Sequence, residues 1–324
     1  MGQRDRGALM GRLLLHRLGG LLTTLFLSSI LIFGSLYLAP GSPENVLFGN
    51  RMPSPAVRAA VRHRLHLDQP LPVRYWDWLT GVLHGDLGTS MVTGQPVADR
   101  IGAGLATTVL LVLMTMVLVV VLGMGMGLAA ALLPGRVDGA VSALTSVSVT
   151  VPPFVASTLL ISVFAVKAGW FPASGIGDGL GGKLDGLVLP AVAMAVISCG
   201  FLARVTRNAV REQVEREHVQ TALVRGLPRT TVLRSHVLRN AMPPIITAIG
   251  LLTAGTFAST LVVESAFAVP GIGQLTIQSV AQKDFPVVQA VALMLVAAFV
   301  LCNAASDLIQ ALVDPRLREA GSTS

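Results

Sequence analysis

Residues 101–135 read IGAGLATTVLLVLMTMVLVVVLGMGMGLAAALLPG, a run of 35 residues that contains no Asp, Glu, Lys or Arg. An α-helix of about 20 apolar residues is long enough to cross the hydrocarbon core of a bilayer. Backbone groups in lipid must find their hydrogen-bond partners within the protein, and a helix provides them within one segment. The run therefore predicts a membrane-spanning helix.

Five further runs without charged residues are long enough to span a membrane: 18–43, 139–166, 186–203, 240–263 and 285–306. The run 186–203 has only 18 residues and contains Pro190, so we expect a short or kinked helix there. The run 18–43 is too long for a signal peptide, and Tyr37 and Leu38 stand where a cleavage site needs small residues. The predicted fold is all-α and integral to the membrane, with six transmembrane helices.

A seventh stretch, 265–282, also lacks charged residues but carries Pro270 and three glutamines. These polar groups are costly in lipid, so we expect a loop folded back against the protein at one membrane face.

Bulk composition agrees with a membrane protein. Hydrophobic residues make up 52% of the chain, charged residues 13%, and mean hydropathy is +0.70; soluble domains carry about 25% charged residues. The net charge of +7 comes from residues in the loops and termini between the charge-free runs. Because this location suits a membrane protein, we expect no nucleic-acid partner. The two cysteines, Cys199 and Cys302, lie in apolar runs, which argues against a disulfide framework or a cysteine metal site.

The distribution of basic residues predicts the orientation. Both termini, the loop at Arg136 and the loop 204–239 carry 15 Lys and Arg in total, and the opposite side carries 9. The positive-inside rule therefore predicts that both termini lie in the cytoplasm.

None of the six runs contains a charged residue or a histidine. Ion-coupled carriers usually keep ionisable groups at membrane depth, so their absence favours an energy source outside the membrane. Backbone carbonyls also bind Na⁺, which leaves an ion-coupled secondary transporter as the alternative class. We do not expect an enzyme, because no catalytic constellation converges and the Gly-rich stretch 177–184 lacks the Ser or Thr of a phosphate-binding loop.

The loop 204–240 carries eight arginines. Its pattern predicts a helix over 204–224, a stop at Gly226 and Pro228, and a second helix over 229–240 before Pro243 and Pro244 open the fifth span. An Arg-rich inner loop also suits anionic lipid, so this pattern by itself leaves its role open.

The long segment 41–100 is predicted to lie outside the cell, with a helix over 56–67. Trp76 and Trp78 suit a membrane interface. The segment is either a cap over the helices or a docking surface for a substrate-delivering binding protein, for which Arg58, Arg62 and Trp76 are the candidates. In the third span, Pro152 and Pro153 predict a kink, either at the translocation path or for packing alone.

Specific motifs add to this pattern. Residues 218–227, HVQTALVRGL, resemble the "EAA" loop of binding-protein-dependent ABC importers in the form YVRTARAKGL of the oligopeptide/dipeptide/nickel family. Gln220, Thr221 and Ala222 occupy the E-A-A positions, of which the first two depart from the consensus, and Gly226 occupies the glycine position.

Four other segments resemble the same family in the right order. They are YLAPGSP at 37–43, LDQPLPVRYW with GDLGTS at 67–76 and 85–90, ESAFAVPGIG at 264–273, and DLIQALVDPR at 307–316. The resemblance extends over about residues 12–318. Importers of this family contain two unlike permeases, and the long outer segment is similar to that of the B-type permease.

The resemblance implies a type I ABC importer permease of MetI-like fold in the bacterial cytoplasmic membrane. Its implied partners are a second, unlike permease, two cytoplasmic ATPases, an extracytoplasmic binding protein and the lipid bilayer. The chain would bind no cofactor or metal, because ATP and Mg²⁺ belong to the ATPases. The residues implied to couple to the ATPases are His218, Gln220, Thr221, Ala222, Arg225, Gly226 and Leu227.

We expect three parts: 1–100 with the first helix and outer segment, a five-helix core over 101–318 containing the coupling loop 204–240, and a tail over 319–324. The resemblance makes short peptides the expected cargo, with nickel complexes, glutathione or glycosides as alternatives.

Overall fold

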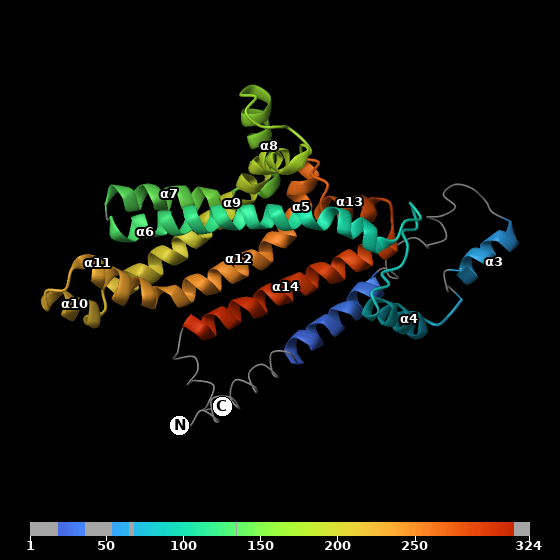
Figure 1. The fold of residues 1–324 in the computed structure, drawn as a ribbon, viewed down its shortest axis with the longest axis horizontal. Helices are drawn as coiled ribbons and strands as arrows, with labels where there is room; N and C mark the ends of the chain where they lie inside the picture. Colours follow the sequence, from blue (N-terminus) through green and yellow to red (C-terminus); the bar gives the residue numbers. More distant parts are fainter. Residues whose placement is uncertain (1–18, 36–53, 65–67, 134, 314–324) are drawn as a thin grey trace. The chain divides into compact units, whose positions relative to one another are not determined.

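The computed structural model describes residues 19–35, 54–64, 68–133 and 135–313. Within these ranges the chain is helical, and an isolated bridge between Thr89 and Pro96 is the one β-type pairing. Figure 1 shows the helices in chain order. The all-α prediction is confirmed.

Four helices in the described ranges are long and apolar enough to cross a membrane. The first is Val97–Leu132, made of α5 (Val97–Leu118), η1 (Val119–Gly123) and α6 (Met124–Leu132). The second is α9 (Gly179–Val214), and the third is Arg229–Ala266, made of α11 (Arg229–Val232), η3 (Leu233–Leu238) and α12 (Arg239–Ala266). The fourth is Phe285–Ser306, within α14 (Phe285–Val313). Each contains most or all of a predicted run.

The run 139–166 forms a broken helix pair. Its first part is α7 (Arg136–Thr150), and its second is α8 (Pro153–Leu160) with η2 (Ile161–Lys167). The two parts meet at an angle of 104°. The break lies at Pro152 and Pro153, since a residue before proline is disfavoured in the α conformation. The predicted kink is confirmed, and the pair counts as one span or as a re-entrant loop.

The first run appears as an apolar helix, Gly19–Ser35, and the rest of that run lies outside the described residues. The described part of the chain thus has four spans, or five if the bent pair is one. The count of six stays a prediction.

Three local predictions were wrong. The stretch 204–224 is not one helix, because α9 ends at Val214 and α10 begins at Glu217. The loop predicted at 265–282 contains a helix, α13 (Ile272–Ala281). Pro243 and Pro244 lie inside α12 rather than at its start. For the helix containing Pro190, expected to be short or kinked, a short helix is excluded because α9 has 36 residues, and the kink stays a prediction. In the outer segment, the described helices are α3 (Pro55–Arg64) and α4 (Leu71–Leu83).

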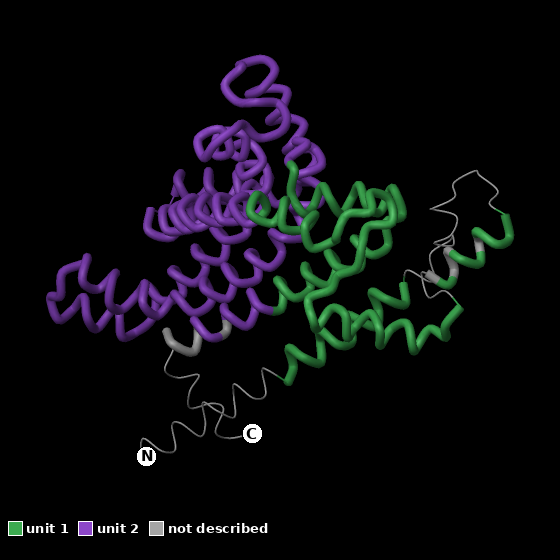
Figure 2. The backbone as a smooth tube through the Cα atoms, turned by 45° about the vertical axis from the view of Figure 1, so that its right-hand side comes forward, with its two compact units in different colours: residues 1–108, 270–300 green, residues 109–269, 301–324 purple. Residues whose placement is uncertain are grey.

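The chain divides into two compact units, shown in different colours in Figure 2. Unit 1 comprises residues 1–108 and 270–300, and unit 2 comprises 109–269 and 301–324. The core of unit 1 is built on Val97, Ile101, Ile272, Val287 and Val291. The division at 100/101 expected from the sequence stays a prediction.

The core of unit 2 depends on close packing of α6 against α9. A Cβ at Gly127 would lie 2.5 Å from the carbonyl oxygen of Ala203 and 2.6 Å from Cβ of Thr206. Only glycine allows this approach, so the G-x-x-x-G pattern at 123–127 marks helix packing.

Candidate functional site

The segment 215–240 in unit 2 contains the residues that the sequence singled out. Helix α10 (Glu217–Val224) begins after Arg216, whose backbone is extended, and Glu217 supplies an acidic side chain to the first turn. A negative charge there is favourable, because the N-terminus of a helix carries partial positive charge. The two-residue break at 215–216 separates α10 from α9.

A Schellman motif ends α10. The N–H of Leu227 donates to the carbonyl of Ala222 (3.2 Å), and the N–H of Gly226 donates to that of Leu223 (3.0 Å). Gly226 has φ of +79°, a conformation that costs an L-residue with a Cβ about 1–2 kcal/mol. The predicted glycine stop is therefore confirmed, and α11 begins directly after Pro228.

One face of α10 is buried in the core of unit 2. Val219 and Ala222 are 2% and 5% exposed, and they belong to the same apolar cluster as Val232 and Val237 from α11 and η3. The opposite side is open: Val224 is 88% exposed. Leu223 and Leu227 are also exposed, so three apolar side chains lie at the tip of the segment. An apolar tip of this kind is suited to contact with another protein.

Two polar side chains attach α10 to its neighbours. The side-chain amide of Gln220 donates to the carbonyl of Val214 (3.1 Å), one of the last carbonyls of α9. The amide of Asn240 donates to the carbonyl of His236 (2.7 Å) and lies 3.4 Å from Nε2 of His218. Gln220 and His218 therefore help to position α10, while the side chains of Thr221 and Arg225 are exposed.

A charged cluster joins α7 to α9 close to this segment in the chain. Nη2 of Arg207 and Nη2 of Arg211 donate to the carboxylate of Asp138 at 2.9 and 2.8 Å. Arg211 also donates to the carbonyl of Ala130 near the end of α6 (3.4 Å). The single carboxylate of Asp138 thus compensates the positive charge of both guanidinium groups.

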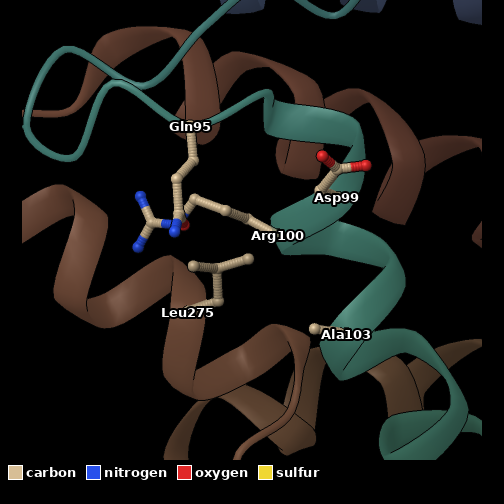
Figure 3. A pocket seen from close by; sticks show the side chains of 5 residues that line it. All are labelled: Gln95, Asp99, Arg100, Ala103 and Leu275. Atoms are coloured by element: carbon tan, nitrogen blue, oxygen red, sulfur yellow. The ribbon is translucent and has the colours of Figure 1, made fainter.

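A second charged cluster lies in unit 1. Asp284 is fully buried, and its carboxylate accepts hydrogen bonds from Arg100 (3.0 Å), the hydroxyl of Ser90 and the N–H of Met91 (3.0 Å). Beside it is a shallow pocket of about 360 Å³ lined by Gln95, Asp99, Arg100, Ala103 and Leu275. Figure 3 shows the side chains of Gln95 and Arg100 converging above Leu275 while Asp99 points away.

Sequence reasoning did not find either cluster. Arg100 and Asp284 are 184 residues apart, and Asp138 and Arg207 are 69 apart. The one available signal was position: Arg100, Asp138 and Asp284 each lie next to the end of a charge-free run, where a charge reaches a partner outside lipid.

The remaining candidates are less fully described. Pro152 and Pro153 form the bend between α7 and α8. Arg58 and Arg62 lie on α3, but their side chains are outside the described part. Trp76 lies on α4 and is 55% exposed. The described residues contain no group of three or more His, Cys, Asp or Glu that could hold a metal ion.

Comparison with protein families gives two matches. The family described as "Binding-protein-dependent transport system inner membrane component" matches residues 122–319. The family described as "Binding-prot-dependent transport system membrane comp, N-term" matches residues 10–112. Together they cover most of the chain.

Relatives of similar length also match. The glutathione transport system permease protein GsiC of Salmonella choleraesuis is 34% identical over 308 residues, which cover 94% of this chain and 98% of the relative. The probable peptide ABC transporter permease protein y4tP of Sinorhizobium fredii is 35% identical over 313 residues, covering 95% and 100%.

Among solved structures, the MetNI methionine ABC transporter in an inward facing conformation contains a similar chain. The TM-score is 0.55 at 19% identity, and the match covers 67% of this chain and 97% of that chain. At this identity the likeness shows the fold, which confirms the expected MetI-like architecture.

Proposed function

This chain belongs to the binding-protein-dependent transport system inner membrane components, and from that premise we propose that it forms, with a second and unlike permease, the translocation path of an importer for short peptides. The family consists of permease subunits of ABC importers in the inner membrane, which work with an ATPase and a binding protein. The finer composition that we propose is two permeases, two cytoplasmic ATPases and one extracytoplasmic binding protein.

The names of the relatives support the cargo. One is a glutathione permease and another a probable peptide permease, and glutathione is itself a short peptide. Nickel complexes, glutathione and glycosides are the alternatives within the family resemblance. The direct test is to purify the partner binding protein and identify its bound ligand by mass spectrometry. A short peptide supports the proposal, whereas a metal chelate or a sugar contradicts it.

We propose that the segment 218–240 couples the permease to the ATPases. The observation that carries this proposal is that one side of α10 is buried and the other is exposed. Val219 and Ala222 pack into the core of unit 2, and Val224 and Leu227 are exposed at the tip of the segment. ATP binding would bring the ATPases together and move this tip. The hydrogen bond from Gln220 to Val214 would then pass the movement to α9. The bend at Pro152 and Pro153 is the proposed part of the translocation path.

The chain is proposed to carry out no covalent chemistry and to bind no cofactor. ATP and Mg²⁺ would belong to the ATPases, which alternate the pore between inward-facing and outward-facing states through differential binding. Co-purification tests this assignment. An importer permease brings down ATPases and a second permease, whereas a self-sufficient ion-coupled carrier does not.

The orientation is also a proposal, with both termini in the cytoplasm. In a background without cysteine, single cysteines at Val224 and Gly81 should react with an impermeant reagent from opposite sides of the membrane. Labelling of both positions in intact cells would contradict the orientation.

For the binding protein, we propose docking on α3 through Arg58 and Arg62. Reversing both charges should weaken docking more at low salt, because exposed charges are screened within about 10 Å at 0.1 M. Equal affinity of the double variant and the parent at both salt levels would contradict it. Trp76 on α4 is the third candidate for docking, and its side chain is 55% exposed.

A further inference from the structure

Helix α4 in unit 1 has three distinct sides. Successive residues of a helix are rotated by about 100°, so Tyr75, Trp78 and Val82 lie on one side. Arg74 and Asp77 lie on a second side, which is polar, and His84 follows directly after the helix. A third side carries Val73, Trp76 and Leu83, which are 45%, 55% and 75% exposed. No side chain of α4 is buried, although the helix is rich in aromatic and aliphatic residues.

The first side packs against the apolar helix Gly19–Ser35. The ring of Phe33 lies 5.5 Å from that of Tyr75 and 5.6 Å from that of Trp78, measured between centroids. The hydroxyl groups of Tyr75 and Ser29 are 2.8 Å apart and hydrogen-bonded. These contacts lie within unit 1 and determine the level of α4 along the first helix.

These contacts place α4 beside the apolar length of the first helix. Ser29 comes six residues before Ser35, the last described residue of that helix, which corresponds to about 9 Å along a helix axis. Helices that lie in a membrane interface bury their apolar side by about 5–10 Å at the boundary of headgroups and acyl chains. Contact with the apolar length of the first helix is the position that such an interfacial helix takes.

The exposed apolar surface of the first helix continues onto α4. Its large exposed side chains are Leu22, Phe26, Leu27, Ile30 and Leu31. Phe26 also contacts Tyr75, at 6.5 Å between ring centroids, so the apolar surface extends from the first helix to α4. Tryptophan is enriched at membrane interfaces because one end of its ring system is apolar and the other is polar.

We propose that α4 is an interfacial helix, with Val73, Trp76 and Leu83 inserted among lipid acyl chains and with Arg74 and Asp77 directed to the headgroups. The helix fastens the outer segment to the membrane surface beside the first span. Its partner is lipid, and this role is independent of the cargo and of the coupling segment. A binding protein or the second permease would be the competing occupant of the apolar side.

The test is photo-crosslinking in the assembled complex in cells. A benzoylphenylalanine replaces Trp76, and a matched variant carries it at Asp77, one residue away on the polar side. After irradiation, the purified chain is analysed by mass spectrometry for phospholipid adducts. Transport activity of both variants establishes that the complex assembles.

We expect several-fold more phospholipid adduct at position 76 than at position 77. An equal or smaller yield at position 76 would overturn the proposal. Cross-linking of position 76 to the second permease or to the binding protein, without a lipid adduct, would also overturn it and would assign the apolar side to that partner.

Discussion

The carboxylate of Asp284 and the guanidinium of Arg100 form an ion pair inside unit 1, with 3.0 Å between Oδ2 and Nη1. The side chain of Asp284 has no exposed surface, and that of Arg100 keeps 15%. The pair joins the first turn of α5 to the residue directly before α14. Ser90 and Met91 bring the preceding loop to the same carboxylate.

Removing the acid should therefore destabilise unit 1. Asp284→Ala leaves the partly exposed guanidinium of Arg100 without its counter-charge; breaking a fully buried pair costs roughly 3–5 kcal/mol, and we expect a smaller loss here because Arg100 keeps contact with solvent. The thermal unfolding midpoint of the purified complex should therefore fall. Asp99→Ala is the control, because Asp99 is a neighbouring exposed acid and its removal should change the midpoint little. Equal midpoints for Asp284→Ala and the parent would show that the pair contributes nothing to stability.

The cluster around Asp138 predicts a loss of stability when its charge is removed. One carboxylate pairs with both Arg207 and Arg211, so Asp138→Asn leaves two guanidinium groups without their shared counter-charge. The variant should therefore unfold at a lower temperature than the parent at neutral pH. Equal unfolding midpoints for Asp138→Asn and the parent would contradict a stabilising role for the cluster.

The two sides of α10 predict opposite behaviour for two acidic substitutions. Ala222 is 5% exposed, so Ala222→Glu buries an unpaired carboxylate and should lower the unfolding midpoint of the chain. Val224 is 88% exposed, so Val224→Glu should change stability by no more than about 0.5 kcal/mol. It should instead weaken the pull-down of the ATPases, because it places a charge at the apolar tip. If Val224→Glu retains the ATPases fully, the tip is not their contact.

The sequence predicted those features that depend on local chemistry. Charge-free runs mark the spans because lipid excludes charges, and the two prolines at 152–153 mark a bend because each disturbs the helical backbone. The left-handed backbone at Gly226 followed from glycine and proline near the end of a helical pattern. The spacing of Gly123 and Gly127 likewise indicated close helix packing.

Features that depend on distant contacts were not predictable. No local signal separates α9 from α10 at 215–216, because Glu215 and Arg216 are both compatible with a helix. The polar residues of 265–282 indicated a loop, yet Ile272, Thr276 and Ser279 are buried in unit 1 and form one face of α13. Tertiary packing decided the outcome there. The burial of Ala222 could not be inferred either, since the motif resemblance indicates contact with a partner and not which side chain faces inward.

Gly226 offers the sharpest test of coupling because its backbone is strained for other residues while its surroundings are open. It has φ of +79°, and no atom lies within 4 Å of a Cβ built there. Gly226→Val should cost about 1–2 kcal/mol or more through backbone conformation alone, and it should displace the Schellman motif that fixes Leu227 and the tip of α10. Gly226→Asn is the matched control, because asparagine adopts the left-handed conformation more readily.

The most direct measurement is ATP hydrolysis by the reconstituted complex with and without substrate-loaded binding protein. If the segment 218–240 couples the permease to its ATPases, the parent and Gly226→Asn should both respond to the loaded binding protein, and Gly226→Val should insert normally but lose most of the response. An equal response from Gly226→Val would contradict the account, because the helix that ends at Gly226 would then not transmit the signal.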